Sequence, residues 1–130
     1  MNILIIGGGG REHCLAWKVS ASDLSGKIFA IPGNPGISQI GECISTHGID
    51  AGSFDRIADF AEQNNIGFTI VGPEAPLVEG IVDFFNARNL KIFGPDKKAA
   101  RLEGSKVFTK ELSRKYKIPT AESTIFAREE

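Results

Sequence analysis

Short apolar runs alternate with helix-type patterns along most of the chain. The runs at residues 2–6, 27–31, 68–71 and 90–93 are mainly apolar, and each is followed directly by glycine or proline. Apolar runs of this length, without regular polar alternation, are typical of strands buried on both faces of a sheet. A weaker pattern at residues 42–44 predicts one more short strand.

Between these runs, the apolar positions follow the spacing of amphipathic helices. Residues 11–21 carry apolar side chains on one helical face, Ser53 is a suitable N-cap for a helix that extends to Gln63, and residues 77–88 show the same periodicity. Strands that alternate with helices form right-handed crossovers, which give a parallel sheet covered by helices on both faces. The sequence therefore predicts a Rossmann-like, three-layer α/β domain.

The character of the chain changes after the last of these strands. Residues 96–116 are rich in lysine, arginine and glutamate and predict one or two surface helices. A break at residues 118–120 precedes residues 122–127, which predict the beginning of a further strand that has no partner within the chain. We therefore expect an α/β domain over residues 1–104, followed over residues 105–130 by a linker and the start of a further, incomplete domain.

Composition and charge argue against several partners and compartments. The net charge of -1 gives no electrostatic attraction to nucleic acid or to an anionic membrane. Cys14 and Cys43 are too few and too isolated for a disulfide framework or a zinc site. The apolar start of the chain stops at Gly7, too early for a signal peptide, and no run approaches the ~18 apolar residues of a membrane span. We therefore expect a cytoplasmic protein.

Three loops rich in glycine and proline follow predicted strands, at residues 7–13, 32–36 and 72–76. The carboxyl ends of parallel strands meet at one edge of the sheet, where ligands of open α/β folds bind. In the first loop, glycines permit a tight turn and let backbone N–H groups approach an anion, which the dipole of the following helix also favours. Arg11 adds a positive charge suited to bidentate phosphate binding. The strand–turn–helix context favours a phosphate site over a tight turn without a ligand.

The first loop does not fit a dinucleotide. The dinucleotide fingerprint requires a third glycine where this chain has Glu12 or His13, and an acidic residue after the second strand, where this chain has residues 32–36. An oxidoreductase domain that binds NAD is therefore disfavoured, and a ligand with a single phosphate fits better.

The third loop carries a candidate polar ligand-binding residue, Glu74, between Pro73 and Pro76. A stiffened loop that holds a carboxylate over the sheet edge suits hydrogen bonds to sugar hydroxyls or to an amine, although a solvated turn residue is an equal alternative. His13 either faces the ligand or covers the start of its helix, and without a visible partner it is not assigned as a catalytic base. His47 is expected in an exposed loop.

Several segments match one known family in the same order along the chain. They are Gly-Gly-Gly-Gly-Arg-Glu-His at residues 7–13 with Ala-Trp-Lys at 16–18, Pro-Gly-Asn-Pro-Gly at 32–36, Val-Gly-Pro-Glu-Ala-Pro-Leu at 71–77, Phe-Gly-Pro at 93–95, Ala-Ala-Arg-Leu-Glu-Gly-Ser-Lys at 99–106 and Ile-Pro-Thr-Ala at 118–121. Together these segments resemble the N-terminal part of the phosphoribosylamine–glycine ligases (GAR synthetases), and the resemblance covers nearly the whole chain.

The resemblance implies a ligation step of de novo purine synthesis. ATP would activate the carboxylate of glycine as an acyl phosphate, and the amine of 5-phosphoribosylamine would attack it to give glycinamide ribonucleotide, ADP and phosphate. The implied fold of this chain is the domain that precedes an ATP-grasp unit. In the complete enzyme ATP and Mg²⁺ or Mn²⁺ would be the cofactors. The expected partners are these small-molecule substrates, with no nucleic acid and no membrane, and a monomer is expected.

By the same resemblance, the glycine loop would hold the 5-phosphate, while Asn34 and Glu74 would contact the ribose and the amine. Lys106 matches the lysine at the entrance to the ATP-grasp domain and would lie near the nucleotide. The predicted substrate-binding residues are Gly8, Gly9, Gly10, Arg11, Glu12, Asn34, Glu74 and Pro76. No catalytic and no metal-binding residue is predicted in this chain.

The enzymes of this family continue well past residue 130, and the resemblance places the glycine site, most of the ATP site and the magnesium-binding acids in that later part. Phosphoryl transfer depends on metal and charged groups placed around the transferring phosphate. The chain alone is therefore expected to be inactive and to hold no cofactor tightly. A non-catalytic module that binds or senses a phosphoribosyl metabolite is the alternative, and Lys106 distinguishes the two because only a ligase would need it.

Overall fold

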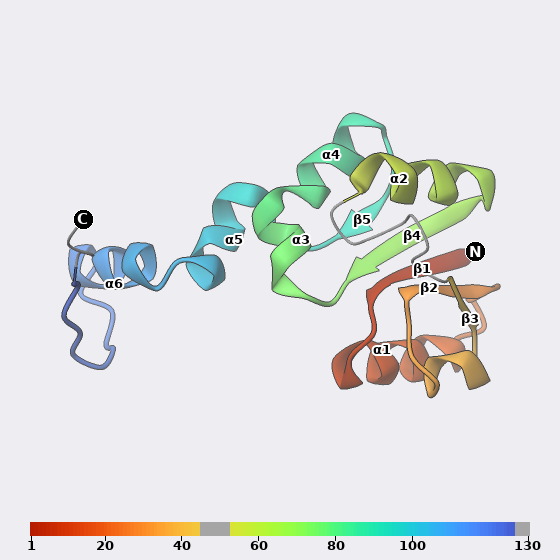
Figure 1. Cartoon of the computed structure of the whole chain (residues 1–130), viewed down its shortest axis with the longest axis horizontal. Coiled ribbons are helices and arrows are strands. Elements are labelled where there is room, and N and C mark those ends of the chain that lie inside the picture. The colour runs from red at the N-terminus through yellow and green to blue at the C-terminus, as the bar shows by residue number, and fades with distance from the viewer. Residues whose placement is uncertain (45–52, 127–130) are drawn as a thin grey trace.

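The computed structural model describes residues 1–44 and 53–126. Its centre is a five-stranded parallel sheet in the order β3–β2–β1–β4–β5 (Figure 1). The strands are β1 (Asn2–Gly7), β2 (Ile28–Pro32), β3 (Glu42–Cys43), β4 (Ile66–Val71) and β5 (Ile92–Phe93). The five strands predicted for the α/β domain are confirmed, including the short third one.

Helices cover both faces of this sheet, as Figure 1 shows. One face carries α1 (Gly10–Ser20) and the short 3-10 helix η1 (Ile37–Gln39), and the other carries α2 (Phe54–Gln63), α3 (Glu74–Glu79) and α4 (Ile81–Ala87). Ser53 occupies the N-cap position of α2, as predicted. The Rossmann-like three-layer α/β class is therefore confirmed.

Two hydrophobic cores lie on opposite sides of β1, because successive side chains of a strand point to opposite faces. Leu4 and Ile6 pack in the core beneath α2, α3 and α4, which includes the fully buried Phe85. Ile3 and Ile5 pack in the core beneath α1 and η1, together with Ala16. The central strand is thus fixed from both sides, and its carboxyl end is held in a defined position.

The single helix predicted over residues 77–88 is wrong, because two helices meet there at Gly80. Gly80 has a φ of 103°, and its N–H donates to the carbonyl oxygens of Pro76 and Leu77 at 3.0 and 3.1 Å, which ends α3. The N–H of Phe84 then donates to the carbonyl of Gly80 at 3.1 Å in the first turn of α4. The left-handed backbone at Gly80, which glycine adopts readily, breaks the helix although the apolar spacing continues through it.

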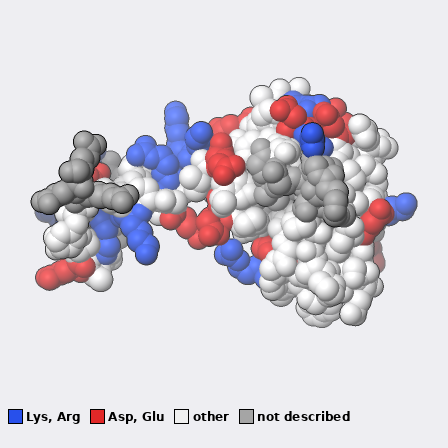
Figure 2. Space-filling view, in the orientation of Figure 1, with Lys and Arg blue, Asp and Glu red and all other residues white. Residues whose placement is uncertain are grey.

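After β5, where one or two surface helices were predicted, the chain forms two, α5 (Lys97–Gly104) and α6 (Lys106–Lys115). Each is capped by a side chain: Asp96 accepts a hydrogen bond from the N–H of Ala99, and Ser105 from that of Phe108. Helix α5 packs against α3, whereas α6 extends away from the sheet (Figure 1). Figure 2 shows lysine and arginine side chains gathered over this α5–α6 part.

The further strand predicted over residues 122–127 is wrong over residues 122–126, which form no strand, while Ala127 lies outside the described residues. Among the described residues no strand pairs with this segment, and side chains of α6 bond to carbonyl groups in and next to it instead. Lys110 donates to the carbonyl of Ala121 at 2.6 Å, and Arg114 donates to the carbonyl of Ser123 at 2.6 Å. None of the helices in the described part of the chain has the length and apolar character needed to cross a bilayer.

Candidate functional site

Three loops leave the carboxyl ends of neighbouring strands and meet at one edge of the sheet. Gly7 is in register with Pro32, and Ile6 with Val71, so β1, β2 and β4 end side by side. The loop after β1 leads into α1, and the loop after β4 leads into α3. This arrangement brings together most of the predicted substrate-binding residues: Gly8, Gly9, Gly10, Arg11, Glu12, Asn34 and Glu74.

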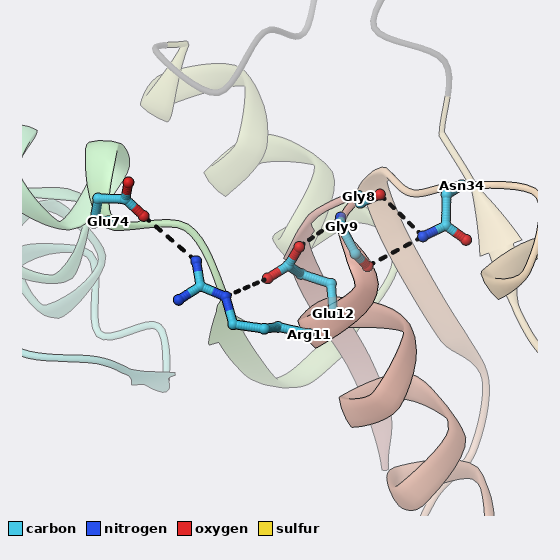
Figure 3. A network of polar contacts seen from close by, with 6 residues as sticks. All are labelled: Gly8, Gly9, Arg11, Glu12, Asn34 and Glu74. Atoms are coloured by element: carbon cyan, nitrogen blue, oxygen red, sulfur yellow. Dashed lines mark hydrogen bonds and ion pairs between the residues drawn. The ribbon is translucent and has the colours of Figure 1, made fainter.

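Glu12 fills the interior of the first loop. Its side chain is only 5% exposed, and its Oε2 accepts a hydrogen bond of 2.6 Å from the N–H of Gly9 (Figure 3). Its Oε1 accepts no hydrogen bond from the described residues and lies 4.0 Å from Nε of Arg11. A Cβ atom on Gly72 would overlap Oε1, and a Cβ atom on Gly7 would lie 2.7 Å from Cγ of Glu12. The carboxylate therefore occupies a space that glycines of two separate loops leave free.

Asn34 joins the second loop to the first. Its Nδ2 donates to the carbonyl oxygens of Gly8 and Gly9 at 2.9 and 3.2 Å (Figure 3). Its Oδ1 accepts hydrogen bonds of 2.9 Å from the N–H groups of Gly36 and Ile37. A side-chain amide offers two donor hydrogens and one acceptor oxygen, so these contacts engage all of its polar groups within the protein.

Arg11 and Glu74 face each other across the edge, one from the start of α1 and the other from the start of α3. Nη2 of Arg11 lies 3.4 Å from Oε2 of Glu74, and the side chains are 68% and 54% exposed (Figure 3). The pKa of the Glu74 carboxyl is lowered from its ordinary value, first by a hydrogen bond from its own backbone N–H and then by the hydrogen bond from Arg11. A solvent-exposed cation and anion on separate loops are thus available to a ligand at this edge.

The other two predicted site residues, Pro76 and Lys106, are not exposed at this edge. Pro76 is buried within α3 rather than exposed at the edge. Lys106 begins α6, is exposed, and is not brought to the edge, since α6 packs against α5. The ring of His13 packs against Gly36, where a Cβ atom would lie 2.6 Å from Nδ1, so this histidine covers the second loop. His47 lies outside the described residues.

Sequence reasoning missed two contacts that shape the edge. It did not predict that Gly72 would be needed beside the Glu12 carboxylate, nor that Gly36 would lie against His13. For Glu12 a signal existed, because it follows Gly9 by three residues, which is the spacing of a capping-box glutamate. For His13 the chain offers no such local signal, since its partner lies in the loop after another strand.

The chain is a parallel α/β domain of the open-sheet class, and its glycine-rich loops and charged pair meet at the carboxyl edge, where ligands of such sheets bind. Residues 1–103 match the family model described as "Phosphoribosylglycinamide synthetase, N domain". The chain therefore belongs to this family, and the resemblance drawn from its loops is confirmed.

Individual relatives agree with the family match. The chain is 55% identical over 130 residues to a phosphoribosylamine–glycine ligase of Pasteurella multocida, and 52% identical over 128 residues to one of Caldanaerobacter subterraneus. These alignments cover 100% and 98% of this chain but only 30% of each relative, so the chain spans less than a third of the length of these curated relatives. A crystal structure of a phosphoribosylamine–glycine ligase from Thermotoga maritima superimposes with a TM-score of 0.62 at 27% identity, covering 94% of this chain and 26% of that one.

Proposed function

We propose that this chain is the substrate-binding N-terminal part of a phosphoribosylamine–glycine ligase, an enzyme of purine biosynthesis that joins 5-phosphoribosylamine to glycine with consumption of ATP. The observation that carries the proposal is the pairing of Arg11 and Glu74 at 3.4 Å across two loops, beside the N-terminus of α1. A phosphorylated sugar with an amine needs both a cation for its phosphate and an acceptor for its hydroxyl or amine hydrogens. The family match to residues 1–103 supports the same substrate.

In this proposal the phosphate binds at the start of α1. The N–H groups of the first helical turn and the positive end of the helix dipole favour an anion there, and the exposed Arg11 side chain can turn towards it. Glu74 then accepts hydrogen bonds from the ribose hydroxyls or from the amine. Asn34 acts through the backbone it holds, because its polar groups are already engaged by the two loops.

The chemical step needs groups beyond this chain. The described residues include no cluster of three or more His, Cys, Asp or Glu side chains that could hold a metal ion, so they do not fit a magnesium or manganese site. We propose that ATP, the metal and glycine bind mainly to the part of the ligase that follows this chain, and that Lys106 meets the nucleotide there. In this proposal the isolated 130 residues are inactive.

We also propose that the enzyme works in the cytoplasm as a monomer, with its small-molecule substrates as its partners. Both cysteines are free, Cys14 exposed and Cys43 partly buried, which suits a reducing compartment. The net charge of -1 gives no support for binding to nucleic acid or to an anionic membrane.

Calorimetric titration with glycinamide ribonucleotide, the stable product, tests the proposal. We expect saturable binding to the wild-type chain and a dissociation constant about 10-fold to 100-fold higher for Arg11→Ala, because a hydrogen bond to a charged group contributes about 1.5–3 kcal/mol. The matched control is Lys18→Ala, which removes an exposed cation further along the same helix and should leave the affinity unchanged. Equal affinities of the wild-type and Arg11→Ala chains would contradict the phosphate assignment.

A second experiment separates a ligase from a metabolite sensor. In the complete ligase, Lys106→Ala should abolish or strongly reduce ligation while leaving the affinity for glycinamide ribonucleotide unchanged. A sensor would bind the ligand with or without Lys106 and would show no turnover.

A further inference from the structure

For most glycines of the first loop, neighbouring atoms of the protein leave no room for a side chain. A Cβ atom on Gly9 would lie 2.8 Å from Oε2 of Glu12, and one on Gly8 would overlap the carbonyl oxygen of Gly33. Gly7, as described above, faces the Glu12 side chain. Gly10 is different, because a Cβ atom there would meet nothing within 4 Å and the residue is exposed.

The buried Glu12 carboxylate also closes the interior of the loop to a second anion. It accepts the hydrogen bond of Gly9, the donor that a phosphate inside the loop would otherwise use. Its negative charge would repel a phosphate placed beside it, and burial weakens the screening of that repulsion by water. The loop is therefore held from within by one of its own side chains, as Figure 3 shows.

We propose that Glu12 is a positioning residue, which sets the inner side of the first loop so that the ligand's phosphate meets only the outward-facing N–H groups of Gly10 and Arg11. Within the described part of the chain, no acceptor bonds these two N–H groups, as is usual in the first turn of a helix. No neighbouring atom of the described residues requires the absence of a side chain at Gly10, and the bare backbone there leaves room for close approach of a ligand. The identity of that ligand rests on the proposed function.

The positioning role of Glu12 is tested without any ligand, by amide hydrogen exchange measured with NMR. In Glu12→Ala the exchange rate of the Gly9 amide should rise about tenfold or more, because its acceptor is lost. In Glu12→Gln the side-chain oxygen can still accept, so the Gly9 rate should stay within about threefold of the wild-type rate. The amide of Ile5, deep in β1, is the internal control and should not change in either variant.

The double variant Glu12→Ala/Gly72→Ala is a control for the case in which Glu12→Ala raises the Gly9 exchange rate only because the loop unfolds. The methyl group of Ala at position 72 would enter the space vacated by the Glu12 side chain, which supports the fold while the acceptor for Gly9 stays absent. Fast exchange at Gly9 in this folded double variant confirms the proposal. An unchanged Gly9 rate in folded Glu12→Ala or in the folded double variant overturns it.

The direction of ligand approach is tested by adding glycinamide ribonucleotide to the wild-type chain and to Gly10→Ala. We expect the amide resonances of Gly10 and Arg11 to shift and that of Gly9 to stay, and we expect Gly10→Ala to keep its melting temperature but bind about tenfold more weakly. Gly8→Ala is the contrasting control, since it should lower the melting temperature through its clash with Gly33. A shift confined to Gly9 overturns the proposal. Absence of any binding by the wild-type chain counts against the proposed function alone, because the Gly9 exchange rates still decide the role of Glu12.

Discussion

Two polar side chains at the carboxyl edge of the sheet, Glu12 and Asn34, make their hydrogen bonds to the protein's own backbone. Glu12 bonds to Gly9 within the first loop, and Asn34 bonds to both the first and the second loop. These contacts fix the loops before any ligand arrives, which lowers the ordering cost of binding. In the proposed function, the exposed Arg11 and Glu74 are then the side chains left to contact the substrate.

The first prediction concerns the coupling between these two exposed charges. In Arg11→Ala the pKa of Glu74 should rise towards its ordinary value, because one of the hydrogen bonds that stabilise the carboxylate is lost. The hydrogen bond from the backbone of Glu74, the larger cause, remains, so the rise should be partial. A titration of the Glu74 side-chain carbon followed by NMR measures this, with Lys18→Ala as a control that should leave the pKa unchanged.

The same pKa shift fixes the sign of a pH effect on stability. Because folding lowers the pKa of Glu74, its contribution to stability is present above the unfolded pKa and is lost as the pH falls through the folded pKa. The stability of Arg11→Ala should therefore depend less steeply on pH in the acidic range than that of the wild type. An equal or steeper dependence on pH in the variant would show that the Arg11–Glu74 pair does not form in solution.

The positions of the site residues could be predicted from the sequence, but their contacts could not. Carboxyl ends of parallel strands converge whatever the loops contain, so the meeting of Arg11, Asn34 and Glu74 follows from the strand pattern alone. Whether Asn34 faces a ligand or the neighbouring loop depends on the backbone conformation around residues 33–36, which residue types do not specify. The substrate-binding roles assigned to these residues stay predictions.

At the scale of elements, apolar runs located all five strands, whereas apolar periodicity misplaced one helix boundary. Ile81, Val82 and Phe85 keep the same spacing from Val78 whether or not the helix is continuous. The periodicity therefore could not reveal that the chain turns at Gly80, where a left-handed residue reorients α4 to pack in the core beside α2. The glycine itself was the better indicator of the break.

A third prediction follows from this break. Gly80→Ala should lower the free energy of unfolding by about 1–2 kcal/mol, because a residue with a Cβ atom is strained at a φ of 103°. A new Cβ atom would also lie 3.2 Å from Cδ of Lys97. Urea denaturation measures the change, and Glu79→Ala, an exposed neighbour at the end of α3, should change the stability by less than about 0.5 kcal/mol. Similar values for both variants would mean that the left-handed turn is not required.

At the scale of the whole molecule, the sheet domain and the α6 segment differ in how they are stabilised. The sheet domain has two cores, whereas α6 contacts mainly α5 and holds residues 120–123 through Lys110 and Arg114. The sequence predicted this change of character from the charged residues after β5, and it indicated that a strand over residues 122–127 would have no partner within the chain, although the local pattern still favoured a strand there. A strand needs a neighbour, and the apolar pattern of one segment says nothing about where that neighbour lies.

The last prediction tests the domain boundary expected near residue 104. A chain that ends after Ser105 should keep its free energy of unfolding within about 1 kcal/mol of the full chain, because α6 contacts mainly α5 and contributes no side chain to the two hydrophobic cores of the described residues. A chain that ends after Pro95 also loses α5, whose Ala100 is buried in the core and whose Gly104 lies against Val78 of α3. That second truncation should cost at least about 2 kcal/mol, since it uncovers apolar surface of α3 and α4. If urea denaturation shows a large loss already for the chain that ends after Ser105, then α6 is an integral part of the sheet domain and the boundary near residue 104 is wrong.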